Sequence, residues 1–195
     1  MAHRPYRMVA RAEAAAATGE RILDATIKLF WELPTVEISL DEVARRAGVT
    51  VQTVIRRFGG RDGLFAAAAE REDERVRSQR NEAPVGDVAG AIQILIEHYE
   101  TLGDGVLKLL AEEDRVPRLR EIADQGRVFH REWCERVFAP ALSGLDGRDR
   151  RRRLAQLVAL CDVYTWKLLR RQAGLSRSQT RLALIELVTP LLEEN

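Results

Sequence analysis

Five arginines and no acidic residue lie between Val43 and Arg61, in a chain whose formal net charge is only +1. Residues 1–61 hold ten basic against seven acidic side chains, whereas residues 62–195 hold 21 against 23. A local excess of positive charge on a nearly neutral protein indicates a polyanionic partner for that segment alone.

Gln52 and Arg56 are the residues of this segment best suited to reading DNA bases. They are four residues apart, so in a helix they share one face, and their side chains match the edges of adenine and guanine in a major groove. Val51 and Ile55 flank them and could contact thymine methyl groups. The remaining candidates suit phosphates or long-range attraction: Ser39, Arg45, Arg46, Thr50, Thr53, Arg57 and Arg61.

This chemistry requires a helix over residues 50–58, although six of the seven residues from Val49 to Ile55 are β-branched and favour a strand. Helical spacing places Val54 and Phe58 on one face, whereas a strand leaves Val54 facing water. The helix cost of a β-branched residue is only about half a kcal/mol. We therefore predict a helix, begun by Thr50 as its N-cap.

The preceding segment predicts a short helix that packs against this one. Ser39 and Glu42 have the spacing of a capping box, and Ile38 and Val43 that of a hydrophobic staple. Gly48 suits the left-handed residue that ends a helix. Two short helices joined in this way must pack against each other, because a helix of two turns is not stable alone.

Hydrophobic periodicity predicts an all-α protein of about nine helices. Residues 1–17 are expected to form a flexible basic arm, and residues 18–80 a three-helix DNA-binding domain with a connecting helix. The break "NEAPVG" separates this domain from a larger helical domain over residues 85–195. Its helices are expected near 88–102, 103–114, 117–137 and 148–172, and from Ser176 nearly to the end.

Composition excludes several other classes of protein. There is no run of 18 apolar residues and no apolar core of a signal peptide near the N-terminus, so we expect a cytoplasmic protein without a membrane span. Two cysteines are too few for a disulfide framework.

The last two predicted helices are apolar over more than one stripe, which one body cannot easily cover. We therefore expect a homodimer in which two helices from each subunit form a four-helix interface. The candidate interface residues are Leu157, Cys161, Tyr164, Leu168, Leu182, Ile185, Val188 and Leu192.

The order of these features resembles the TetR family of transcriptional regulators. The resemblance rests on "ERILDATIKLF", "SLDEVARRAGVTVQTVIRRF" and "GGRDGLF", in which Ala44, Gly48, Val54 and Phe58 match the core of the family's helix-turn-helix. Members commonly have Tyr where this chain has Ile55, and Lys where it has Arg61.

The resemblance implies a dimer that binds a near-palindromic operator in double-stranded DNA, most commonly as a repressor. It also implies a small-molecule effector that enters a cavity of the larger domain and moves the DNA-reading heads. The candidate lining residues are His98, Tyr99, Leu107, Phe129, Trp133, Tyr164 and Trp166.

Other functions remain as alternatives. His130 and Cys134 have a spacing that can hold a metal, but two ligands make no site, and thiol sensing by Cys134 and Cys161 is a further option. No HExxH, GxSxG or Gly-rich context favours an enzyme, so we expect neither catalytic residues nor a cofactor or metal. A helical interaction module would differ from a DNA reader by the lack of a steep salt dependence.

Overall fold

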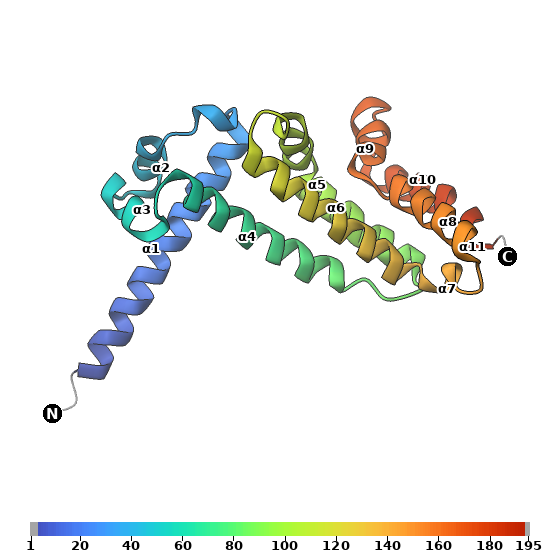
Figure 1. Cartoon of the computed structure of the whole chain (residues 1–195), viewed down its shortest axis with the longest axis horizontal. Helices are drawn as coiled ribbons and strands as arrows, with labels where there is room; N and C mark the ends of the chain where they lie inside the picture. The colour runs from blue at the N-terminus through green and yellow to red at the C-terminus, as the bar shows by residue number, and fades with distance from the viewer. Residues whose placement is uncertain (1–3, 194–195) are drawn as a thin grey trace. The chain divides into compact units, whose positions relative to one another are not determined.

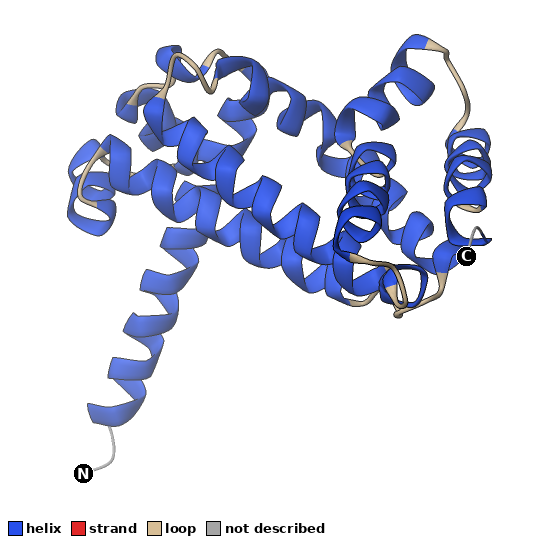
Figure 2. Cartoon of the chain, turned by 45° about the vertical axis from the view of Figure 1, so that its right-hand side comes forward, coloured by secondary structure: helices blue, strands red, loops and turns tan. Residues whose placement is uncertain are grey.

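The computed structural model describes residues 4–193, with the backbone alone for residues 4–10. Every regular element in this part of the chain is a helix, which confirms the all-α prediction (Figure 2). The N-terminal elements are α1 (Arg4–Glu32), η1 (Thr35–Glu37), α2 (Leu40–Ala47), α3 (Val51–Phe58) and α4 (Arg61–Asn81). The later elements are α5 (Val88–Glu112), α6 (Pro117–Val137), α7 (Ala139–Leu142), α8 (Gly147–Leu160), α9 (Val163–Trp166), η2 (Lys167–Gln172), α10 (Arg177–Val188) and α11 (Pro190–Glu193).

The chain divides into two compact units, residues 1–72 and 73–195, and the division falls within α4. In the first unit, α2 packs against both α1 and α3 (Figure 1). The core of this unit includes Ile22 and Leu29 of α1, Val43 of α2 and Val54 of α3, all fully buried. Three helices therefore bury one apolar stripe each and leave their polar sides exposed.

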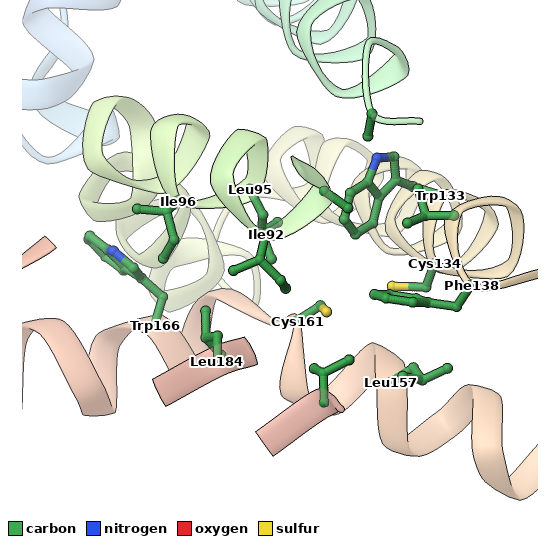
Figure 3. Packing of buried hydrophobic residues seen from close by; sticks show 14 of the residues in the cluster. Ile92, Leu95, Ile96, Trp133, Cys134, Phe138, Leu157, Cys161, Trp166 and Leu184 are labelled. Carbon is green, nitrogen blue, oxygen red and sulfur yellow. The ribbon is translucent and has the colours of Figure 1, made fainter. Parts of the chain in front are cut away.

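The second unit is built around α5, which contacts α6, α9 and α10. Figure 3 shows its core, in which apolar side chains of α5 lie between Trp133 of α6 and Trp166 of α9. Gly103 of α5 is necessary here, because a Cβ at that position would stand 2.6 Å from the Trp166 ring. These contacts make a separate hydrophobic core for the larger unit.

Helix boundaries differ from the prediction in three places. α1 begins at Arg4 rather than near residue 18, so the described part of the expected flexible arm is helical, and residues 1–3 lie outside the described residues. α5 continues through Gly103 instead of giving two helices, because this glycine is buried in the core.

The third difference lies in the expected helix over 148–172. Asp162 begins a new helix there, since its side chain accepts a hydrogen bond from the Tyr164 amide at 2.9 Å. The following η2 is a π-helix, a rare form that rotates later side chains relative to a regular helix. The single apolar face that regular 3.6-residue spacing predicts for residues 148–172 is therefore divided among α8, α9 and η2.

No helix among the described residues is both long and apolar enough to cross a membrane.

Candidate nucleic-acid interface and effector core

The start of α2 is set by Ser39, whose hydroxyl accepts a hydrogen bond from the Glu42 amide at 3.2 Å. The Glu42 carboxylate binds the guanidinium groups of Arg45 and Arg46 at 2.6–2.8 Å. Gly48 then ends the helix with φ +65°, a conformation that glycine adopts without a Cβ penalty. The Ser39 half of the expected capping box is thus formed, while Glu42 serves the two arginines.

α3 is a helix in spite of its β-branched residues, which confirms the prediction from spacing. The Thr50 hydroxyl accepts the Thr53 amide at 3.2 Å, and Gly59 ends the helix in a left-handed conformation. Val54 is fully buried against the core of the first unit. Burial of this one valine shows why tertiary packing overrides the weak strand preference.

The opposite side of α3 is exposed and has the residues expected to read DNA. Gln52 and Arg56 are both exposed, and neither has a polar partner among the described residues. Ile55 is 39% exposed beside them, and Val51 is half-buried. The arrangement leaves one amide and one guanidinium available to a groove, with apolar atoms at their side.

Arg57 and Arg61 have structural contacts that the sequence did not indicate. Arg61 donates from Nη2 to the Thr35 carbonyl at 2.6 Å and from Nε to the Ile38 carbonyl at 3.2 Å. The Arg57 guanidinium lies against Gly19 of α1, where a Cβ would collide with it. Both arginines therefore connect separate segments of the first unit. This structural role is independent of any contribution to phosphate binding.

Arg45 and Arg46 are paired with carboxylates rather than free. Arg46 also binds Glu32 of α1 at 2.6 Å. Hydrogen bonds from Arg45 and Arg46 lower the pKa of Glu42 to about 2, so this carboxylate remains ionised at neutral pH. The local positive charge near α2 is smaller than the arginine count suggests.

The fold and this exposed helix define a DNA-binding protein of the helix-turn-helix class. Residues 22–68 match the family model of "Bacterial regulatory proteins, tetR family". The resemblance indicated by the sequence motifs is therefore confirmed over residues 22–68, which carry the N-terminal domain of the TetR family, and the chain is a DNA-binding transcriptional regulator.

Solved structures share the fold over most of the chain. A transcriptional regulator from Rhodococcus sp. is 22% identical, with 90% of this chain and 96% of that chain covered and a TM-score of 0.69. NalD, the secondary repressor of the MexAB-OprM multidrug efflux pump in Pseudomonas aeruginosa, is 21% identical, with 90% and 96% covered and a TM-score of 0.61. The multidrug binding protein EbrR, complexed with imidazole, is 24% identical, with 86% and 88% covered and a TM-score of 0.53.

No curated protein matches the chain.

The expected effector-lining residues fall into two groups in the second unit. His98, Tyr99, Phe129, Trp133 and Trp166 are buried, and Leu107 is half-buried at the edge of the same core. Tyr164 is 51% exposed, because the turn at Asp162 directs it to the surface. Tyr164 therefore does not join the buried aromatic residues.

Arg80, at the end of α4, is a buried residue that the sequence analysis missed. It is 3% exposed, and its guanidinium carbon lies 4.2 Å from the centre of the Trp133 ring. Its Nη2 is 3.0 Å from Nδ1 of His130. Only the proximity of α4 and α6 in the fold reveals this cluster. In the sequence, nothing distinguishes Arg80 from other arginines near the end of a helix.

His130 and Cys134 do lie together, with Nε2 and Sγ 3.9 Å apart. The described residues contain no group of three or more His, Cys, Asp or Glu side chains that could hold a metal ion. The neighbouring Cys161 thiol lowers the pKa of the Cys134 thiol, and both cysteines are buried in the core.

The expected dimer residues also separate into two groups. Leu157, Cys161 and Val188 are fully buried within their own subunit, so their assignment to an exposed interface is corrected. Ile185 and Leu192 are half-buried. Tyr164, Leu168 and Leu182 remain more than half exposed, and they are joined by Leu187, which the prediction omitted.

Proposed function

We propose that the chain is a ligand-responsive repressor that binds a near-palindromic operator as a homodimer. The observation that carries the proposal is the outer face of α3, where Gln52 and Arg56 are exposed without polar partners among the described residues. An unpaired amide and guanidinium one turn apart can each make a bidentate contact with a base edge.

Phosphate contacts set the position of such a helix on DNA. The N-terminal turn of α3, with Thr50 and Thr53, offers backbone amides and hydroxyls to a phosphate. Ser39 has the same role at the start of α2. Arg57 and Arg61 add positive charge from an already ordered position, and Arg45 and Arg46 contribute less because Glu42 offsets part of their charge.

Dimerisation is supported by the apolar side chains that the second unit leaves exposed. The exposed residues are Tyr164 of α9, Leu168 of η2, and Leu182 and Leu187 of α10. Monomeric proteins rarely expose several large apolar residues in one region. A second copy of the chain would cover these side chains. It would also supply the second reading helix that a two-fold symmetric DNA site requires.

Ligand response is supported by the buried aromatic residues of the second unit and by the functions of two proteins with similar structures. NalD is a repressor of a multidrug efflux pump, and EbrR is a multidrug binding protein. We propose that the effector contacts His98, Tyr99, Leu107, Phe129, Trp133 or Trp166. Tyr164 is assigned to the dimer face instead.

Selection of bound sequences from random double-stranded DNA tests the proposal. We expect a near-palindrome with half-site centres about one helical turn apart, roughly 34 to 36 Å. Affinity for the recovered site should fall steeply as salt rises, since phosphate contacts release counterions. Recovery of no preferred sequence, with salt-insensitive binding, would favour the helical interaction module.

A promoter assay tests the repressor part separately. The recovered site is placed over a promoter, and we expect less transcription when the protein is present. Increased transcription would show an activator that uses the same DNA-reading helix.

A further inference from the structure

Arg80 is held rigidly at the end of α4. Its carbonyl oxygen accepts hydrogen bonds from Nε1 of Trp133 at 2.8 Å and from Nη2 of Arg136 at 3.2 Å. Its guanidinium lies over the rings of Trp133 and Phe129. Backbone and side chain are both fixed, so the direction of this cation is set by the fold.

The charge of Arg80 has no carboxylate partner among the described residues. Its Nε is buried and makes no hydrogen bond, and its one polar side-chain contact is His130. Two other arginines of the second unit are paired with carboxylates: Arg170 binds Glu100 at 2.8 Å, and Arg171 binds Asp104 at 2.9 Å. Arginine remains protonated in proteins, so burial of Arg80 leaves a cation without an anion.

The geometry of His130 shows that it does not neutralise Arg80. Its Nε2 is 3.1 Å from the Val158 carbonyl, which can only accept a hydrogen bond. The ring proton therefore lies on Nε2, and Nδ1 presents a lone pair to Arg80. His130 is a neutral partner that orients the guanidinium.

His98 of α5 has a second buried polar atom without a hydrogen-bond partner in the described part of the chain. It is 4% exposed, and its Nδ1 makes no hydrogen bond in the described part of the chain. Burial, followed by the charge of Arg80, lowers the pKa of His98 to about 3, so the ring is neutral at physiological pH. A neutral imidazole can donate one hydrogen bond to an anion.

We propose that Arg80 and His98 form the polar end of the effector site and that the effector is a carboxylate with an apolar, flat body. The Nε–H of Arg80 would donate to a carboxylate oxygen, a charge-assisted bond that arginine makes with favourable planar geometry. The rings of Phe129, Trp133 and Tyr99 suit an apolar body. The inference rests on the proposed ligand response and names the chemical class of that ligand.

The position of Arg80 also supplies a route for regulation. α4 is one continuous helix that carries Arg80 near its end and Arg71 about 13 Å earlier along its axis. Arg71 binds Glu20 and Asp24 of α1, the first helix of the DNA-binding unit. A carboxylate bound to Arg80 would therefore contact the same helix that is bound to α1.

Thermal unfolding of the full-length protein without DNA tests the anion site. The probes are acetate, octanoate, benzoate and 2-naphthoate, each compared with its neutral carboxamide at equal concentration. We expect at least one acid to raise Tm while its amide does not. Equal shifts for every acid and amide pair would overturn the proposal.

Variants then assign the effect to Arg80. Arg80→Gln keeps an amide donor for His130 and should weaken the active acid roughly ten- to a hundredfold, the range expected for a lost charge-assisted hydrogen bond. Arg80→Lys keeps the charge and should retain a weaker preference for the acid. This variant tests the proposal if Arg80→Gln does not fold. Arg151→Gln, an exposed arginine of α8, is the matched control and should leave the shift unchanged. An unchanged preference for the acid in both Arg80 variants would refute the assignment.

Release from DNA is measured in parallel with the same acid. Loss of operator binding on adding the acid, together with an Arg80-dependent Tm shift, supports both proposals. An Arg80-dependent Tm shift with unchanged DNA affinity supports the anion site and contradicts ligand-responsive regulation. A Tm shift that does not depend on Arg80, with DNA release, contradicts the anion site alone.

Discussion

The outer face of α3 and the surfaces of η2 and α10 both leave side chains exposed, but these side chains are of opposite kinds. On α3 the exposed groups include Gln52 and Arg56, which water solvates at little cost. On the second face they are Leu168, Leu182 and Leu187, whose exposure to water is unfavourable. The first face can remain solvated until a polyanion arrives, whereas the second favours permanent burial against another subunit.

The largest expected effect separates the exposed apolar face from the core beneath it. Leu157→Asp should abolish folding of the second unit, because an ionised or unpaired carboxyl at a fully buried position costs about 4 kcal/mol or more. Leu182→Asp, at a position 53% exposed, should leave the fold intact and dissociate the dimer. Circular dichroism and mass in solution measure the two effects.

A Leu182→Asp protein that remains a dimer would show that Leu182 lies outside the interface. Ala155→Asp on the exposed side of α8 is a control for surface charge and should change neither quantity.

The next effect tests the polar face of α3. Arg56→Ala and Gln52→Ala should each relax preference at one base position by about 1 to 3 kcal/mol, because each removes one base-edge contact. Arg151→Ala and Gln125→Ala are exposed controls in the second unit. Selection from random DNA measures the change, and identical recovered sites for both α3 variants would show that this face does not read bases.

Substitution of Arg61 tests whether this residue both stabilises the first unit and binds DNA phosphates. Arg61→Ala should lower the free energy of unfolding by about 1 to 3 kcal/mol, because the carbonyls of Thr35 and Ile38 lose their charged donors. It should also weaken binding to all DNA sequences alike. Chemical denaturation and binding to two unrelated sequences measure these effects.

Arg61→Lys keeps the charge but cannot reach both carbonyls with a planar fork. Recovery of DNA affinity without recovery of stability would separate the two roles. Unchanged stability in Arg61→Ala would contradict the structural one.

The smallest effect concerns Glu42. Its pKa is lowered to about 2 by Arg45 and Arg46, below the ordinary 4.5, so it stabilises the fold above about pH 4.5 and loses this contribution as pH falls toward 2. Glu42→Gln should remove that part of the acid dependence of unfolding. Freed arginines should also raise non-specific DNA affinity slightly and steepen its salt dependence.

Much of the DNA-binding unit could be predicted from sequence because its signals are local. Ser39, Thr50 and Gly48 cap helices through bonds to residues only a few positions away, and the α3 helix followed from the spacing of Val54 and Phe58. The second unit was less predictable. A single turn at Asp162 and the π-helix after it redirected side chains that a regular helix would have aligned.

The amino-acid sequence by itself determined the helical class, the helix-turn-helix and the exposed pair Gln52 and Arg56, because caps and hydrophobic periods act within one or two turns. Only the tertiary structure decided which apolar residues face the core and which cations are paired. Arg61 binds carbonyls 23 and 26 residues away, and Arg80 meets a histidine 50 residues later. Such partners are set by how helices pack, and no local pattern records them.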